Sequence, residues 1–346
     1  MRRLSVVILL AAVVMLVGGA GPPHGTSADP GGKVYWTNPA GIYRANLDGS
    51  ALEELVTGSI MGIALDVAAG KIYWADYDKI RRANLDGAGV EDLATGLSDP
   101  AGIALDEAAG KMYWTTLGGK IQRADFDGSG VEDLVTGLPQ PMAIALDVAA
   151  GKMYWTDHCN TAKIQRANLD GTGVEDLLTG PGDCNDIALD LAAGKMYWPH
   201  GGAISRANLD GSGVEDLITG LVTPWGIALD VGGGKMYWTE PLTDRIRRAN
   251  LDGSGAEDLL VSPVWLSGYV ALDLGQPEPT ATPTPSLTPG AVGGIAELPA
   301  MGSAALEGSG ASGGDAGYVA ALAAVVAAGV VTLAGGAWYA RRRWLR

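Results

Sequence analysis

Gly-Lys-Met-Tyr-Trp-Thr-Asp, at Gly151–Asp157, is the stretch on which the prediction of the fold rests. Near-copies recur about every 40 residues, a period typical of repeat architectures. Their Tyr-Trp pairs begin at Tyr35, Tyr73, Tyr113, Tyr154, Tyr197 and Tyr237. Each copy is followed, in the same order, by versions of Arg-Ala-Asn-Leu-Asp-Gly, Val-Glu-Asp-Leu and Ile-Ala-Leu-Asp. This order predicts one domain built from a repeated unit.

Each repeat divides into four short segments separated by turn residues, which is the pattern of an all-β fold. In the fourth Tyr-Trp copy the strands are expected at Ile144–Asp147, Lys152–Thr156, Ile164–Leu169 and Val174–Leu178. The run Met153-Tyr154-Trp155 places apolar side chains on both faces of its strand, as in a sheet packed between two others. Four-stranded blades stacked around an axis meet this requirement, so a β-propeller is predicted rather than a parallel solenoid.

The number of segments predicts six blades. Six copies of Ile/Val-Ala-Leu-Asp begin at Ile63, Ile103, Ile144, Ile187, Ile227 and Val270. The first Tyr-Trp segment, at Tyr35, has no such copy before it, and the last copy, Val270–Asp273, has no Tyr-Trp segment after it. Pairing these two segments would complete the sixth blade from both chain ends and remove the open sheet edge.

The repeats resemble the Tyr-Trp-Thr-Asp (class B) repeats of the low-density lipoprotein receptor family, whose members form six-bladed propellers. The resemblance covers about Asp29–Leu274, within the predicted propeller domain of residues 29–275. The fourth motif position holds Asn38, Asp76, Thr116, Asp157, His200 and Glu240, so the aspartate is kept at two positions. The cysteine-rich growth-factor-like modules of the animal receptors do not flank this propeller, so receptor endocytosis and developmental signalling are not expected.

The segments around the propeller predict export and membrane anchoring. Residues 1–28 have the features of a signal peptide, with an uncleaved anchor as the alternative. Residues 276–317 are rich first in Pro and Thr and then in Gly and Ala, as in an extended stalk. Residues 318–340 are apolar and uncharged, as in a transmembrane helix, and the basic residues 341–346 are expected on the cytoplasmic side. The expected location is the cell surface, with the propeller outside.

The stalk also contains a stretch similar to a bacterial sorting signal. Leu298–Gly302 reads Leu-Pro-Ala-Met-Gly and resembles Leu-Pro-x-Thr-Gly, with a membrane span and a basic tail following as in that family. Met301 replaces the threonine at the cleavage point, so plain membrane retention is favoured over processing by a transpeptidase.

Loops that differ between repeats predict a binding face. The turns from strand 1 to 2 and from 3 to 4 are nearly identical, whereas the other two connections vary in length and sequence. All variable loops should emerge on one face of the ring, and loops on a rigid scaffold commonly carry function; simple loop drift is the alternative. The candidate binding residues are Tyr77, Pro100, Pro141, His158, Asp186, His200, Trp225, Glu240 and Trp265.

The charge of the chain limits its partners. The formal net charge is -15, so a nucleic acid would be repelled. The expected ligand is a protein or a glycan on the extracellular side, and the expected oligomeric state is a monomer.

The two cysteines, Cys159 and Cys184, are predicted to form a disulfide, because the chain is expected to be exported. A metal site is the alternative. His158 and His200 lie in neighbouring repeats near Asp157, Asp183 and Asp186, and these side chains are zinc ligands in other proteins. The disulfide is favoured, with no bound metal and no cofactor.

Catalysis is the second functional hypothesis, because six-bladed lactonases and phosphotriesterases hold a metal in their central channel. The positions that enter strand 1 are Gly62, Gly102, Ala143, Asp186, Gly226 and Tyr269. A ring dominated by Gly and Ala offers few ligands and no acid–base pair. A binding module is therefore favoured over a metal-dependent hydrolase. A third hypothesis, a structural spacer of the cell envelope, would suit more uniform loops.

One arginine in each repeat is expected to pair with acidic residues of the adjoining strand and to set its register. These arginines are Arg44, Arg82, Arg123, Arg166, Arg206 and Arg248. The turns of the type Asn208–Gly213 are interpreted as glycine-containing hairpin turns rather than calcium loops.

Overall fold

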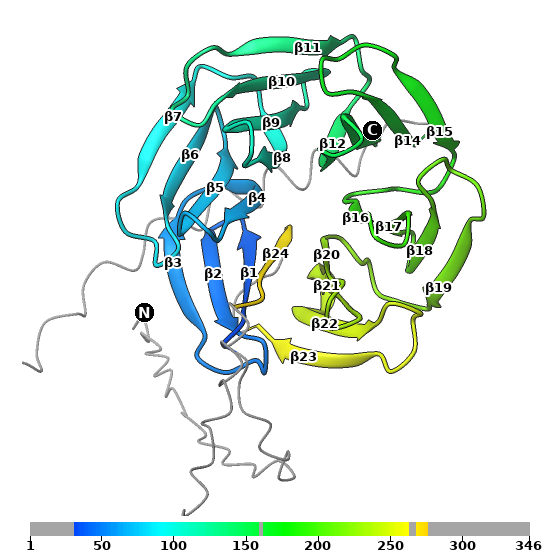
Figure 1. Ribbon diagram of the computed structural model, residues 1–346. Helices are drawn as coiled ribbons and strands as arrows, with labels where there is room; N and C mark the ends of the chain where they lie inside the picture. Colours follow the sequence, from blue (N-terminus) through cyan, green and yellow to red (C-terminus); the bar gives the residue numbers. More distant parts are fainter. Residues whose placement is uncertain (1–30, 159–161, 263–267, 276–346) are drawn as a thin grey trace, which may run out of the picture. The chain divides into compact units, whose positions relative to one another are not determined.

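Six antiparallel sheets of four strands each stand around a central axis in the computed structural model of the chain (Figure 1). The structure describes residues 31–158, 162–262 and 268–275. The predicted signal peptide, stalk, membrane helix and tail lie outside the described residues, as do Cys159 and Trp265. Within the described residues, no helix is long and apolar enough to cross a membrane. The predicted six-bladed β-propeller is confirmed.

Every blade runs from an inner strand at the axis to an outer strand at the rim. Blades are numbered from the one that contains the first Tyr-Trp strand. In the order of blades 2, 3, 4, 5, 6 and 1, the inner strands are β4 (Ile60–Asp66), β8 (Pro100–Asp106), β12 (Pro141–Asp147), β16 (Ala188–Asp190), β20 (Ile227–Asp230) and β24 (Val270–Asp273). The Tyr-Trp strands of blades 1 to 6 are β1 (Lys33–Asn38), β5 (Lys71–Asp76), β9 (Lys111–Thr116), β13 (Lys152–Asp157), β17 (Lys195–His200) and β21 (Lys235–Glu240). The third strands are β2 (Gly41–Asn46), β6 (Lys79–Asn84), β10 (Lys120–Asp125), β14 (Lys163–Asn168), β18 (Ala203–Asn208) and β22 (Arg245–Asn250). The outer strands are β3 (Glu53–Thr57), β7 (Glu91–Thr95), β11 (Glu132–Thr136), β15 (Glu175–Thr179), β19 (Glu215–Thr219) and β23 (Glu257–Val261).

The ring closes by pairing the two ends of the propeller. Strand β24 lies antiparallel to β1, with Val270 opposite Trp36 and Asp273 opposite Lys33 (Figure 1). Blade 1 therefore consists of β24, β1, β2 and β3, as the unmatched first and last segments predicted. Because this pairing joins the two chain ends, β1 has a hydrogen-bonded partner on both sides and blade 1 is complete.

The inner strands are long in blades 2 to 4 and short in blades 5, 6 and 1. Strands β4, β8 and β12 have seven residues each, whereas β16 has three and β20 and β24 have four. The expected start of β12 at Ile144 was therefore too late, because the strand begins at Pro141 and its register shifts before Ile144. Equivalent shifts occur in β4 and β8.

The Tyr-Trp pair builds the contacts between blades. All six tryptophans are at most 1% exposed, so their prediction as core residues is confirmed. Successive side chains of a strand point to opposite faces, so Tyr and Trp reach opposite neighbours. At every junction the tyrosine of one blade and the tryptophan of the next belong to the same cluster of buried side chains, as Tyr113 and Trp155 do. One dipeptide thus supplies both sides of each interface.

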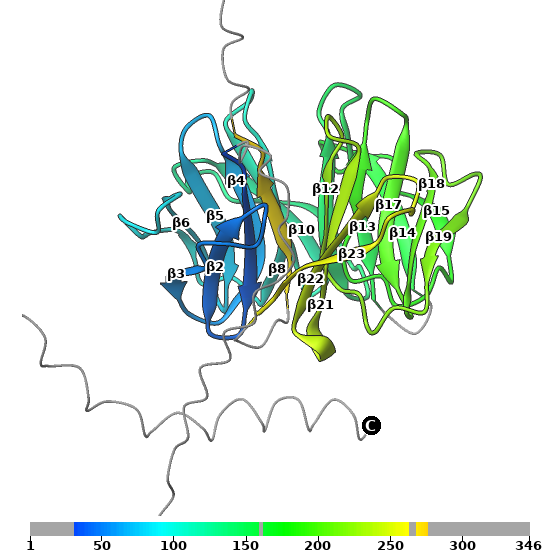
Figure 2. The ribbon, with the colours of Figure 1, turned by 90° about the horizontal axis from the view of Figure 1, so that it is seen from below.

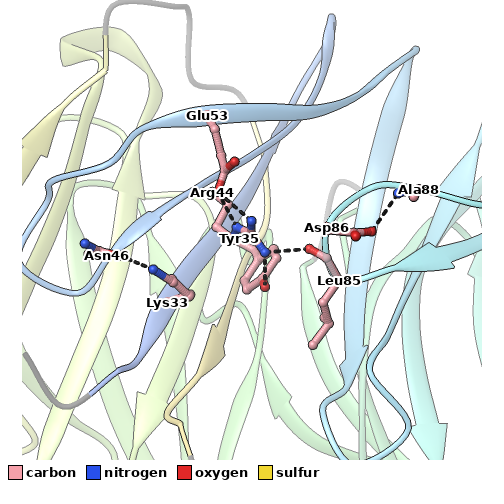
Figure 3. Close-up of polar contacts among 8 residues, drawn as sticks. All are labelled: Lys33, Tyr35, Arg44, Asn46, Glu53, Leu85, Asp86 and Ala88. Atoms are coloured by element: carbon pink, nitrogen blue, oxygen red, sulfur yellow. Dashed lines mark hydrogen bonds and ion pairs between the residues drawn. The ribbon is translucent and has the colours of Figure 1, made fainter. Parts of the chain in front are cut away.

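The repeated arginine links neighbouring blades as well as neighbouring strands. Arg44 donates from Nε and Nη2 to Glu53, at 2.8 and 2.5 Å, which confirms the cross-strand pairing (Figure 3). Its Nη1 also donates to the Tyr35 hydroxyl and, at 2.8 Å, to the carbonyl oxygen of Leu85 in blade 2. The other five arginines make the same cross-blade bond, to the carbonyl oxygens of Phe126, Leu169, Leu209, Leu251 and Leu47.

We expect Arg166→Ala to lower the free energy of unfolding by about 2 kcal/mol, because it removes a charged donor from the part-buried Leu209 carbonyl. The matched control is Glu175→Gln. It weakens the half-exposed ion pair with Arg166 and should cost less than about 1 kcal/mol. Urea denaturation of both variants measures the difference, and equal losses would rule out the cross-blade bond as the cause.

Candidate functional site

The variable loops gather on one face of the ring. We define the variable-loop face as the connections from the second to the third strand of a blade and from each outer strand to the next inner strand. Hydrogen bonds join these two kinds of loop: Leu97 N to Asp78 O at 2.8 Å, His158 N to Gln140 O at 3.0 Å and Leu221 N to Gly202 O at 2.8 Å. The coiled ribbon below the β21 label in Figure 2, between β21 and β22, is the single-turn helix η1 (Pro241–Thr243) on this face.

The predicted binding residues differ widely in exposure. Tyr77 is 73% exposed, and His158, His200 and Trp225 are partly buried. The remaining described candidates are buried and do not present a surface to a partner: Pro100, Pro141, Asp186 and Glu240. Both prolines begin inner strands, and the Glu240 carboxylate accepts hydrogen bonds from Trp238 Nε1 and Arg247 Nη1. Trp265 lies outside the described residues.

Two exposed apolar residues of the variable-loop face were missed from the sequence. Leu242, within η1, is 74% exposed, and Val222 is 45% exposed. Trp225 N donates to Thr239 O at 2.9 Å, so Trp225 lies at the base of the loop that carries Leu242. The length of the loop after β21 was the available signal, because an apolar residue at the tip of a long loop has few neighbours to cover it.

The fourth motif position is occupied by side chains that take part in local networks. Asp76 Oδ2 lies 3.3 Å from Arg81 Nη1, and Glu240 Oε1 lies 3.1 Å from Arg247 Nη1. In blade 5, His200 Nε2 lies 2.7 Å from the Ser205 hydroxyl, which donates to Asp216 at 2.5 Å. These contacts hold the second, third and outer strands together, which is a structural role.

The predicted corner around His158 and His200 is only partly described. Among the described residues, no group of three or more His, Cys, Asp or Glu side chains is placed to hold a metal ion. Cys184 is fully buried and forms no disulfide with a described residue, and its burial raises the pKa of its thiol. The disulfide to Cys159 stays a prediction, because Cys159 lies outside the described residues.

Close contacts between adjacent blades explain the glycines at the entrance of the inner strands. A Cβ atom on Gly102 would lie 2.5 Å from Met142 O and 2.7 Å from Ala143 Cα in the next blade. Gly226 faces Tyr269 Cα in the same way, at 2.9 Å. Glycine is therefore needed here because the inner strands of adjacent blades approach each other backbone to backbone.

Asp186 replaces a bridge that threonine makes in other blades. Thr115 Oγ1 accepts from Gly102 N in its own blade and donates to Met142 O in the next, and Thr37 and Thr239 make equivalent bonds. Blade 5 has Pro199 at this position. The Asp186 carboxylate instead accepts from Ile187 N at 2.8 Å and from Ile227 N of blade 6 at 2.9 Å. Burial raises the pKa of Asp186 to about 7.

Together, the closed ring and the variable-loop face define the class of protein, a six-bladed β-propeller. The turns on one of its faces are nearly identical from blade to blade, and the loops on the other face differ. The model of the low-density lipoprotein receptor repeat class B family matches residues 151–191. The chain therefore carries a repeat of that family, which confirms the resemblance drawn from the Tyr-Trp motif.

Solved structures of the same fold are similar over most of the propeller. A chain of a nidogen–laminin complex is 22% identical with a TM-score of 0.64, over 70% of this chain and 98% of that chain. A putative TolB from Agrobacterium tumefaciens is 14% identical with a TM-score of 0.55, over 66% and 87%. A gluconolactonase from Xanthomonas campestris is 18% identical with a TM-score of 0.52, over 61% and 78%. No curated protein matches the chain. These likenesses show the fold.

Proposed function

We propose that this protein is a cell-surface binding module that engages a protein or glycan through its variable-loop face. The observation that carries the proposal is the exposure of Tyr77 and Leu242, each more than 70% exposed, on the face whose loops vary. Tyrosine is among the residues that most often anchor binding partners, and Leu242 adds exposed apolar surface on the same face. They stand on a ring whose blades are linked by buried aromatic pairs and arginine bonds, so the partner meets a preformed surface.

Two further observations support binding rather than catalysis. Asp186, the acidic residue at the entrance of an inner strand, has both carboxylate oxygens engaged by backbone N–H groups. The class B repeat occurs in receptor proteins, and one structural relative was solved as part of a nidogen–laminin complex. Residues 1–28 and 318–340 are proposed to export the propeller and to hold it at the membrane, with residues 276–317 as the stalk.

The test is binding of the fluorescently labelled propeller to the surface of the cells that produce it. We expect the double substitution Tyr77→Ser and Leu242→Ser to weaken saturable binding at least tenfold, because it removes two apolar anchors. The matched control is Val148→Ser with Val231→Ser, which changes two exposed apolar residues of the 1–2 turns on the opposite face. Equal binding by the two double variants would reject the variable-loop face as the site.

A further inference from the structure

Blade 6 carries three exposed apolar side chains at the variable-loop face. Val222 is 45% exposed in the loop that enters the blade, and Leu242 is 74% exposed in η1. Val261 is 64% exposed at the end of β23, where the chain enters the next variable loop. We call these three residues the blade 6 patch.

Hydrogen bonds link the segments that carry the blade 6 patch. Trp225 N donates to Thr239 O at 2.9 Å, and the first two members of the patch each lie three residues from this bond. On the other side of η1, Ser262 N, directly after β23, donates to Asp244 O at 2.7 Å. The patch therefore belongs to adjoining segments of one blade and its entering loop.

The other repeats provide an internal comparison for this patch. The loop Gly220–Ile227 has the same length and the same Gly, Leu and Pro positions as Gly96–Ile103, which has Ser98 in place of Val222. The other five outer strands end in threonine where β23 ends in valine: Thr57, Thr95, Thr136, Thr179 and Thr219. Blade 6 is thus apolar where other blades have a hydroxyl group, so the fold itself does not require these side chains.

Backbone strain lies in the same region. Four non-glycine residues of the described chain have a left-handed φ, and two of them, Thr223 (φ 48°) and Asp244 (φ 53°), adjoin the patch. This conformation is especially unfavourable for Thr223 because its side chain is β-branched. Strained residues that a fold retains cluster at functional sites, which supports a binding role for this region.

The loops of the variable-loop face are electronegative. They contain no Lys, Arg or Glu, and their aspartates, all but Asp186 at least partly exposed, are Asp78, Asp99, Asp183, Asp186 and Asp244. Basic residues that begin third strands are paired with aspartates of the outer strands, as Arg245 is with Asp258 at 2.9 Å. The charge of these loops is therefore complementary to a basic partner.

We propose that the blade 6 patch binds a protein segment in which apolar side chains stand beside lysine or arginine. The apolar side chains cover Val222, Leu242 and Val261, and the aspartates of the surrounding loops attract the basic ones. A glycan fits this surface less well, because three aliphatic side chains offer it no hydrogen bonds and an acidic glycan would be repelled. The inference rests on the proposed function and names the chemistry of its partner.

The first experiment measures the binding of three fluorescein-labelled peptides to the purified full-length chain by fluorescence anisotropy. One peptide alternates lysine with leucine, the second glutamate with leucine, and the third lysine with serine. We expect the lysine–leucine peptide to bind saturably and roughly tenfold more tightly than the other two. Its binding should weaken roughly threefold when NaCl is raised from about 30 mM to about 300 mM. No saturable binding of this peptide, or equal binding of either other peptide, would overturn the proposal.

The second experiment replaces all three patch residues, two of them by the residue that another blade has: Val222→Ser, Leu242→Ser and Val261→Thr. Binding of the lysine–leucine peptide should weaken roughly tenfold, because the apolar surface is removed. The matched control replaces three exposed valines of the rim and should bind normally: Val131→Ser, Val174→Ser and Val214→Ser. Undiminished binding by the patch variant, or an equal loss in the control, would overturn the proposal. Should the patch variant fail to fold, Leu242→Ser alone takes its place and should weaken binding in the same direction.

The inference and the proposed function can fail separately. If the labelled propeller finds no saturable site on the producing cells while the lysine–leucine peptide binds the patch, the proposed cell-surface function is rejected and the chemistry of the patch stands. If the propeller binds those cells but the peptide neither binds nor competes, the inference is rejected and the binding module stands.

Discussion

Replacing Gly102 with alanine is expected to lower the free energy of unfolding by about 3 kcal/mol, the upper part of the range for overpacked cores. The added Cβ atom would lie 2.5 Å from Met142 O and 2.7 Å from Ala143 Cα. Both neighbours are backbone atoms of β12, so no side chain can turn away, and the two blades must move apart. Urea denaturation, followed by far-ultraviolet circular dichroism, measures the loss.

The control for this substitution is Gly118→Ala in the turn between β9 and β10. A Cβ atom there meets only Ser98 and Thr116 at 3.5 Å or more, an ordinary contact. Its stability should stay within about 0.5 kcal/mol of the unmodified protein. A similar loss in both variants would show that the close approach of blades 3 and 4 is not what requires glycine at position 102.

Asp186→Asn is expected to remove a pH dependence of about 2 to 3 kcal/mol between pH 5 and pH 8. Burial raises the pKa of Asp186 from 3.8 to about 7. The folded state therefore holds this proton more tightly than the unfolded state, so stability falls as the pH rises from about 4 towards 7 and levels off above it. Asparagine does not titrate. The free energy of unfolding of the unmodified protein, relative to that of Asp186→Asn, should therefore fall as the pH rises from 5 to 8.

The measurement is the free energy of unfolding of both proteins at several pH values, in a buffer free of amines. Asparagine leaves one backbone N–H without an acceptor, which lowers the stability of Asp186→Asn by the same amount at every pH. This constant loss does not affect the comparison, which depends on how the difference changes with pH. Asp86→Asn is the control for general charge effects, because Asp86 lies in an exposed turn on the opposite face. A difference between the unmodified protein and Asp186→Asn that is independent of pH would contradict the raised pKa.

The candidate site was predicted less well than the fold. Comparing the turns within one chain predicted that the variable loops share one face of the ring, and hydrogen bonds join the two kinds of loop on that face. Individual residues could not be chosen in this way, because exposure depends on neighbours that are distant in sequence. Pro100 and Pro141 look like loop residues but begin β8 and β12 and are buried, whereas Leu242 and Val222 were overlooked and are exposed.

The sequence by itself determined the all-β class, the six blades and the closure of the ring, because each depends on a pattern that repeats. Tyr-Trp pairs can be counted, and the unmatched ends at Tyr35 and Val270 can pair in one way. Only the tertiary structure decided how the blades are joined. The arginine bond to a carbonyl of the next blade, the close approach at Gly102 and the bridge from Asp186 to Ile227 connect residues about 40 positions apart. Such contacts depend on the distance between blades, which local sequence patterns do not contain.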